Sequence, residues 1–217
     1  MQKTRKEGDG GQQVPKKPRR NATATRQAIL EAARRAFTRC GYDGVGVREI
    51  AQNAGVTAML VNRYFGSKAK LFEEVVETTL AVPGILRNEI AKAGNDVSRL
   101  SRALAATIVA ATSPGGSPLD GILLLIRSAS NAQAAGILRE SALGHLKPLV
   151  DILPGEHPAQ RAALFLSVVA GFQLMRRVIA LPALAEGDAS VLATYLQDLI
   201  ERLLLEARPA EDAHKRT

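Results

Sequence analysis

The chain has 217 residues, of which 46% are hydrophobic, so it can bury a substantial core and is not disordered over most of its length. Aromatic residues make up only 4% while alanine and leucine are abundant, a balance that favours packed helices over β-sheet. We therefore expect an all-α protein.

The net charge of +8 is distributed unevenly. Up to Phe72 there are 15 basic and 5 acidic residues, a net charge of +10, whereas the remainder has 14 basic and 16 acidic residues, a net charge of −2. This asymmetry indicates a polyanion-binding module attached to a nearly neutral body. The alternative is a basic, solvated tail without a partner.

Several classes of protein are disfavoured. Cys40 is the single cysteine, so no intramolecular disulfide is possible. No apolar signal segment and no stretch near the ~20 apolar residues of a membrane span is present, so we expect a cytoplasmic protein without membrane contact. No HExxH, GxSxG, CxxC or glycine-rich phosphate loop occurs, and the three histidines lie in different segments; we expect no enzyme, metal or cofactor.

Residues 1–22 are rich in Gly, Gln, Pro, Lys and Arg and have almost no apolar content, which predicts a disordered basic arm. Such an arm can follow DNA phosphates or enter a minor groove. It can equally be a solubility tail.

The first helix is predicted to begin near Thr23 or Thr25, either of which can cap it, and to end at Gly41. Apolar residues recur along it at helical spacing. It should pack across the next two helices and form a small core with Tyr42, Ile50, Val56, Val61 and Phe65.

The segment from Val47 to Tyr64 has the spacing of a helix-turn-helix. Apolar residues at i, i+3, i+4 and i+7 predict a short, half-buried helix over Val47 to Ala54. Gly55 allows a sharp turn, and Thr57 is placed to cap a second helix over Ala58 to Tyr64. In this motif the second helix enters the major groove of DNA.

A fourth helix is predicted to begin at Ser67, and its first turn is unusual. Lys70 occupies the position where a capping box has Glu or Gln, and Lys68 also lies in this turn. Cations at a helix N-terminus oppose the helix dipole, so a compensating partner such as a DNA phosphate is expected. Two solvated lysines, tolerated at small cost, are the alternative.

Together these residues resemble the N-terminal domain of the tetracycline-repressor (TetR) family. The resemblance covers about Thr25 to Leu80. It is carried by GY at Gly41-Tyr42, REIA at Arg48 to Ala51, AGV at Ala54 to Val56, and Tyr64, Phe65, Gly66, Ser67, Lys68, Leu71 and Phe72. It implies a homodimeric, ligand-responsive transcriptional repressor with an N-terminal three-helix helix-turn-helix domain and a C-terminal helical regulatory and dimerisation domain.

The resemblance also implies positions that contact double-stranded operator DNA. Chemistry agrees for several of them, because arginine can bond guanine edges or phosphates, asparagine can pair with adenine, and methionine can meet a thymine methyl. The implied contacts are Arg48, Thr57, Ala58, Met59, Asn62, Arg63, Tyr64 and, to a phosphate, Lys68.

The sequence departs from the family pattern at four positions of this module. Gly46 stands where Ser or Thr usually caps the second helix, Leu60 where a small or polar residue is usual, Asn62 where an aromatic is common, and Tyr64 where histidine is common. The scaffold is therefore implied, whereas the base sequence that it reads is not.

Beyond Leu80 the pattern predicts further helices separated by Gly- and Pro-containing breaks. They are expected over 85–93, 97–112, 119–131, 134–153 with a bend near Gly144 and Pro148, 158–181 and 189–207. The expected domains are the arm (1–22), a DNA-binding domain (23–66), a ligand-binding and dimerisation domain (67–207) and a frayed tail (208–217).

Two of these helices are apolar around most of their circumference. Residues 122–126 are five consecutive aliphatics, and 162–175 contain only Ser167 and Gln173 as polar side chains, so both should be buried centrally or at a subunit interface. The family resemblance implies a homodimer through the last two long helices. The residues expected at that interface are Leu166, Val169, Leu192, Leu196, Leu199 and Leu203.

A small-molecule effector is implied by the family, and the inventory of the middle helices favours a mainly hydrophobic one. The possible wall residues are Leu104, Ile108, Leu125, Arg127, Ser128, Asn131, Phe165, Phe172, Gln173 and Met175. Ordinary core packing is the alternative for each of them. At the level of function, the alternatives are a DNA-binding regulator or architectural protein whose body binds a protein partner, and a regulator with an enzymatic body.

Overall fold

The computed structural model describes residues 19–80, 82–94, 96–113 and 120–205. All regular structure in these ranges is helical, as the composition predicted. The predicted frayed tail and residues 1–18 of the predicted arm lie outside them. The helices are α1 (Arg19–Cys40), α2 (Val47–Asn53), α3 (Ala58–Phe65), α4 (Lys68–Thr79), α5 (Val82–Ala93), α6 (Val97–Ala111), α7 (Asp120–Ser128), α8 (Ala132–Val150), α9 (Pro158–Gln173), the π-helix η1 (Leu174–Val178), α10 (Pro182–Ala185) and α11 (Ala189–Leu204).

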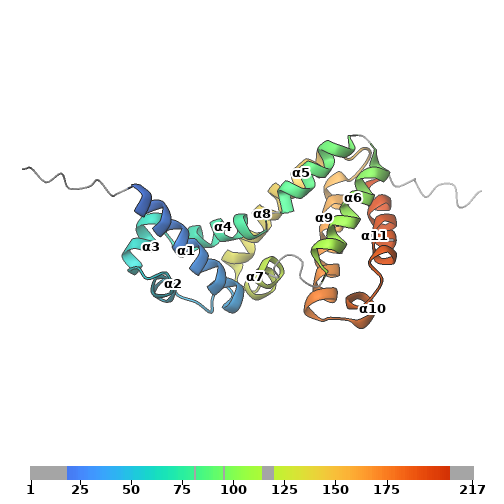
Figure 1. Cartoon of the computed structure of the whole chain (residues 1–217). Helices are drawn as coiled ribbons and strands as arrows, with labels where there is room; N and C mark the ends of the chain where they lie inside the picture. The colour runs from blue at the N-terminus through green and yellow to red at the C-terminus, as the bar shows by residue number, and fades with distance from the viewer. Residues whose placement is uncertain (1–18, 81, 95, 114–119, 206–217) are drawn as a thin grey trace, which may run out of the picture.

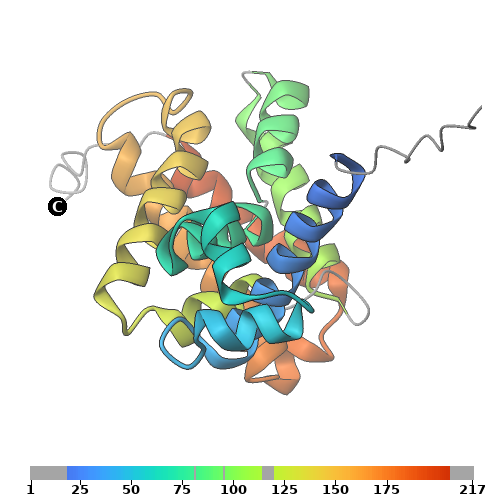
Figure 2. The ribbon, with the colours of Figure 1, turned by 90° about the vertical axis from the view of Figure 1, so that its left-hand side faces the viewer.

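Two lobes are joined by helices that run between them (Figure 1). Helices α1, α2 and α3 form one end, here called the head. Helices α6, α9, α10 and α11 form the other end, and α4, α5, α7 and α8 lie between. Figure 2 views the head end-on. None of the helices in the described ranges is both long and apolar enough to cross a membrane.

The head core is built around three aromatic rings. Phe37 and Phe72 are fully buried and meet edge to face with ring centroids 5.0 Å apart, and Tyr42 meets Phe72 in the same way at 4.9 Å. The expected core is confirmed, because Ile50, Val61 and Phe65 are buried in this cluster and Val56 is packed against it. The same cluster includes buried residues of α4, α7 and α8, namely Leu71, Val75, Val76, Leu124, Ala134 and Leu138.

A second core fills the other lobe. Residues of α6, α9 and α11 supply most of it, with Leu146 and Leu149 from the far part of α8. Helix α8 therefore contributes to both cores, since its Leu138 belongs to the first. The predicted boundary at residues 66/67 falls within the first core, because α4 packs there.

Several helix bounds differ from those expected. Helix α1 begins at Arg19, so residues 19–22 of the predicted arm are helical. Helix α5 begins at Val82 with Pro83 in its first turn, where proline is tolerated because its missing N–H would have no intrahelical partner. Helix α8 continues through Pro148, which has no N–H and therefore removes one intrahelical hydrogen bond, that to the Gly144 carbonyl, without ending the helix.

The region expected to be one helix over 158–181 is interrupted. Helix α9 ends at Gln173 and continues as η1, in which the Ile179 N–H donates to the Leu174 carbonyl at 3.0 Å, five residues back. Because this wider turn lies at the end of the segment, few residues follow it whose spacing could reveal it in the sequence.

The head is held to the middle helices through the end of α1. Gly41 has φ of +73°, and a β-carbon there would collide with the carbonyl oxygen of Arg127 on α7. Next to it, the Tyr42 N–H donates to the Ser128 hydroxyl at 3.1 Å and the Tyr42 hydroxyl to the Gln133 side-chain oxygen at 2.8 Å. The Arg127 guanidinium donates to the Thr38 carbonyl.

Candidate nucleic-acid interface

The turn between α2 and α3 is set by one glycine and one cap. Gly55 has φ of +69°, a conformation that glycine adopts without strain. Thr57 is extended, and its hydroxyl accepts from the Leu60 N–H at 3.4 Å, which caps α3 as predicted. Because Val61 and Phe65 are buried, one face of α3 is fixed against the head and the opposite face is directed to solvent.

The solvent face of α3 presents three side chains of different chemistry. Met59 is 78% exposed, and Asn62 and Arg63 are also exposed. Their spacing of i, i+3 and i+4 places them together on one side of the helix. Within the described residues no carboxylate pairs with Arg63. This side therefore offers an apolar group, a paired donor and acceptor, and a free cation.

Other predicted contacts on α3 are less accessible. Thr57 is exposed at the cap, whereas Ala58 and Tyr64 are half-buried and pack against the head core. Leu60 is also half-buried, which explains why an apolar residue is accepted there. Ala58 and Tyr64 can meet a ligand only with part of their surface.

Cations flank this face on both neighbouring helices. Arg48 is exposed in the first turn of α2, and no ion pair to it is found in the described part of the chain. In the first turn of α4 lie Lys68, half-buried, and Lys70, exposed, with no acidic residue in that turn. Ser67 caps α4 by accepting from the Lys70 N–H at 3.2 Å, as predicted.

Lys68 is held in place by Tyr42. Its ammonium lies 4.4 Å from the centroid of the Tyr42 ring, a favourable cation–π contact. Burial, and then the nearby Asp43 carboxylate, raises the pKa of Tyr42, so its hydroxyl stays protonated and donates to Gln133. Tyr42 thus connects Lys68, at the start of α4, to α8.

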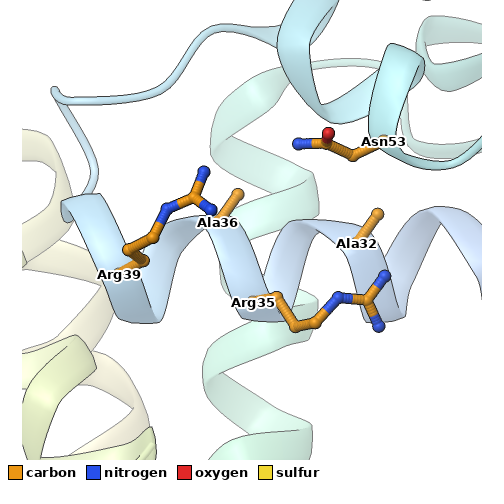
Figure 3. A pocket seen from close by; sticks show the side chains of 5 residues that line it. All are labelled: Ala32, Arg35, Ala36, Arg39 and Asn53. Carbon is orange, nitrogen blue, oxygen red and sulfur yellow. The ribbon is translucent and has the colours of Figure 1, made fainter.

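A small pocket of about 200 Å³ lies elsewhere on the head, between α1 and α2 (Figure 3). It is lined by Ala32, Arg35, Ala36, Arg39 and Asn53. It is smaller than typical small-molecule sites of about 300 Å³ or more, and Arg39 is engaged by Glu49 at 3.3 Å. None of the predicted DNA contacts lines it.

The residues nominated for an effector site divide into two groups. Leu104, Ile108 and Phe165 are buried in the second core, with Phe172 packed against it and Gln173 and Met175 nearby in sequence. The remaining four lie where the head meets α7 and α8: Leu125 and Arg127 are exposed, Ser128 is buried under Tyr42, and Asn131 caps α8 and donates to Asp43 at 2.8 Å.

Five of the six residues expected at a dimer interface face their own subunit. Val169 and Leu196 are buried in the second core, and Leu166, Leu192 and Leu203 pack against it. Leu199 is 51% exposed. The apolar stripe on α11 is wide, and the period alone does not tell which of its sides a partner would cover.

Exposed apolar side chains do lie elsewhere on the same two helices, and the four given next are here called the α9/α11 face. Leu164 of α9 is 54% exposed, and Val191, Tyr195 and Leu199 of α11 are 50%, 67% and 51% exposed. The last three recur every four residues, so they lie on one side of α11. Sequence reasoning missed three of these four residues, although the i, i+4 spacing was visible.

Comparison with known proteins agrees with the arrangement of the two lobes. A family model described as bacterial regulatory proteins, tetR family, matches residues 29–75. A second model, described as Tetracyclin repressor-like, C-terminal domain, matches residues 98–204. Together they cover most of the head and most of the helices beyond it, here called the body.

Similar curated proteins match over the N-terminal part. The HTH-type transcriptional repressor AcnR of Corynebacterium efficiens is 44% identical over 48 residues, which are 22% of this chain and 26% of that protein. The HTH-type transcriptional regulator AcrR of Shigella flexneri is 36% identical over 76 residues, which are 35% of each chain. The chain thus spans about a quarter to a third of the length of these relatives.

Among solved structures, a TetR-family regulator from Streptomyces coelicolor is similar over nearly its whole length. The identity is 25% and the TM-score 0.55, and the alignment covers 88% of this chain and 99% of the other.

Proposed function

Because the chain belongs to the TetR family of bacterial transcriptional regulators, which are not enzymes, we propose that it is a homodimeric repressor that binds an inverted-repeat operator in the cytoplasm. The observation that carries the proposal is the exposed side of α3. There Met59, Asn62 and Arg63 stand together on a helix whose opposite side is locked into the head core.

The flanking cations make the surroundings of this surface positively charged. Arg48 on α2 and Lys68 and Lys70 on α4 bracket α3, and the first third of the chain carries the excess positive charge. Phosphate contacts from such residues set the register on DNA, while contacts from α3 to base edges select the sequence. Thr57, Ala58 and Tyr64 contribute at the margins of the contact.

The α9/α11 face is the surface through which we propose that two copies pair. Exposed leucine, valine and tyrosine side chains grouped on adjoining helices favour association. A two-fold pairing repeats one surface on both subunits and presents two α3 helices to two half-sites. Leu199 is retained from the sequence prediction, whereas Leu164, Val191 and Tyr195 replace the residues that pack inward.

The body is proposed to bind a small, mainly hydrophobic effector that releases the operator. The predicted wall residues that fit this role are those in or against the second core, which include Ile108, Phe165 and Phe172. Release requires that the effector bind a state of the body in which the heads no longer fit DNA. The contact between Tyr42 and α8 is one connection through which such a state can reach the head.

Selection of binding sequences from random duplex DNA by the purified protein tests the proposal. The expected result is an enriched inverted repeat, which then serves as the probe in a screen for small molecules that release the protein. Recovery of no preferred sequence would contradict the repressor function itself.

A further inference from the structure

Two arginines occupy the buried side of α9 and η1, where the pattern calls for apolar residues. Ala162, Phe165 and Val169 are buried at helical spacing, and Phe172 and Arg176 continue that row. Arg161 and Arg176 are only 8% and 5% exposed. Arginine remains charged in proteins and is unfavourable to bury unless it is fully paired, so each needs an explanation.

Arg161 is explained by the end of α11. Its Nε donates to the Leu203 carbonyl at 2.9 Å, its Nη2 donates to the Leu204 carbonyl, and its Nη1 donates to the Pro154 and Glu156 carbonyls. All three nitrogens have acceptors. The last carbonyls of a helix have no intrahelical donors, so Arg161 closes the C-terminus of α11.

Arg176 is not explained in the same way. Among the described residues only its Nη1 finds acceptors, the Val109 carbonyl at 3.0 Å and the Thr112 hydroxyl at 2.9 Å. In the part of the chain that the structure describes, its buried Nε has no acceptor and no carboxylate lies within ion-pair distance. The guanidinium is therefore a buried cation with an unused donor edge.

The end of α6 does not depend on Arg176. The Val109 carbonyl also accepts from the Ser113 hydroxyl at 2.9 Å, so it keeps a donor without Arg176. The Thr112 hydroxyl has its own acceptor, the Ile108 carbonyl, at 2.8 Å. Removing Arg176 would leave none of these groups unpaired.

The surroundings of Arg176 define a chemical class of ligand. The edge formed by Nε and an Nη of a guanidinium matches the two oxygens of a carboxylate. Phe172 lies beside it, with its ring centroid 5.6 Å from the guanidinium carbon, and the apolar second core continues from there. Arg176 also lies within the π-helical turn η1, a local widening that is often found at functional sites.

We propose that the effector of this protein is an amphiphilic anion whose carboxylate pairs with Arg176 and whose apolar part packs toward Phe172 and the second core. The inference rests on the proposed ligand-responsive function and adds the chemical class to it. It assigns to Arg176 a role in effector recognition and to Arg161 a purely structural one.

The test compares ligands that share a skeleton and differ in the head group. Full-length protein is titrated with 4-phenylbutyrate, 4-phenylbutanol and 4-phenylbutylamine, and with octanoate and 1-octanol as a linear pair. Binding is read from the unfolding midpoint and from calorimetry, and release is read from fluorescence anisotropy of labelled operator. Carboxylates are expected to bind wild-type protein and release DNA, whereas the alcohols and the amine are not.

The variants Arg176→Met and Arg161→Met separate recognition from structure. Arg176→Met is expected to weaken carboxylate binding by at least about tenfold while the midpoint of the free protein stays the same or rises. Arg161→Met is expected to lower that midpoint by about 4 °C or more, because the end of α11 loses its donors, and to keep the preference for carboxylates.

Three results would overturn the inference. They are carboxylates that bind no better than their alcohols, an Arg176→Met variant that keeps the preference, and an Arg176→Met variant as destabilised as Arg161→Met. If the alcohols bind and release operator while carboxylates do not, the repressor function stands and only the inference fails. If instead the wild-type protein binds no operator in the absence of ligand, the proposed function is contradicted.

Discussion

Each residue on the exposed side of α3 suits a different element of a base pair. Arginine forms paired hydrogen bonds with guanine, asparagine does so with adenine, and a methionine side chain can contact the methyl group of thymine. Met59, Asn62 and Arg63 are exposed and have room to make such contacts. Ala58 and Tyr64 are half-buried, because part of their surface packs against the head core. We therefore expect the first three to determine most of the base preference.

Replacing Arg63 by alanine should weaken operator binding by about 1–3 kcal/mol and relax the preference at one position of each half-site. Competition binding with single-base variants of the operator measures both effects. Arg35→Ala is the matched control, since it removes an exposed arginine of the same domain from α1 and should leave the base preference unchanged. Unaltered affinity and preference in Arg63→Ala would exclude the proposed role.

Lys68 is expected to act on the backbone of DNA and not on its bases. Lys68→Gln should weaken binding to all sequences alike and reduce the slope of log K against log salt concentration by about 1. Titrations at several salt concentrations measure the slope. A change of base preference with the slope preserved would show that Lys68 does not contact a phosphate.

At the scale of the helices, the features that depend on nearby residues were predictable from the sequence. Caps at Thr57 and Ser67 and left-handed glycines at Gly41 and Gly55 require only local chemistry, and the structure contains all four. The start of α1 was misplaced because Thr23 and Thr25 are plausible caps that the helix does not use. The π-turn of η1 was missed because it lies at the end of its segment, where few residues follow to show a shift of the apolar period.

Features that depend on which helices become neighbours were not predictable. Arg127, Ser128 and Asn131 looked like polar groups of an effector site, but they bond to the end of α1 and the residues that follow it. Leu196 looked like an interface residue, but it faces α6 and α9 in its own core. An apolar pattern at helical spacing identifies the side of a helix that is buried, but it does not tell which other helix or subunit packs against that side.

The two glycines of the head make a matched pair for stability. Both have positive φ, but a β-carbon at Gly55 meets open space whereas one at Gly41 collides with Arg127 on α7. Gly55→Ala should cost about 1–2 kcal/mol, the strain of the left-handed conformation. Gly41→Ala should cost more than about 3 kcal/mol because the collision adds to that strain. Equal costs in chemical denaturation would contradict the close packing of α1 on α7.

At the scale of the whole molecule, the two cores do not coincide with the two lobes. The head core extends into α4, α7 and the first part of α8, and α8 continues into the second core. Movement of α8 can therefore displace Tyr42 and Lys68 without unfolding either core. This continuity is a physical basis for coupling the proposed effector site to the heads.

Pairing of two copies through the α9/α11 face predicts that Leu199→Asp and Tyr195→Asp yield monomers. A charge placed in a desolvated apolar contact is costly, so the dimer should dissociate while the monomer, in which these positions are exposed, stays folded. Light scattering coupled to size-exclusion chromatography measures the mass. Leu143→Asp is the control, because Leu143 of α8 is 58% exposed but lies outside this face. Retention of the dimer in both α11 variants would show that the two copies pair through another surface.

The most direct test of the account is a hydroxyl-radical footprint of the protein on its selected operator. Two identical heads that each place α3 in the major groove should protect two patches related by the symmetry of the repeat, with centres one helical turn or a multiple of it apart on one side of the duplex. The Arg63→Ala variant should weaken both patches equally. A single protected patch, or two patches that respond differently to the substitution, would contradict a two-fold repressor that reads DNA through α3.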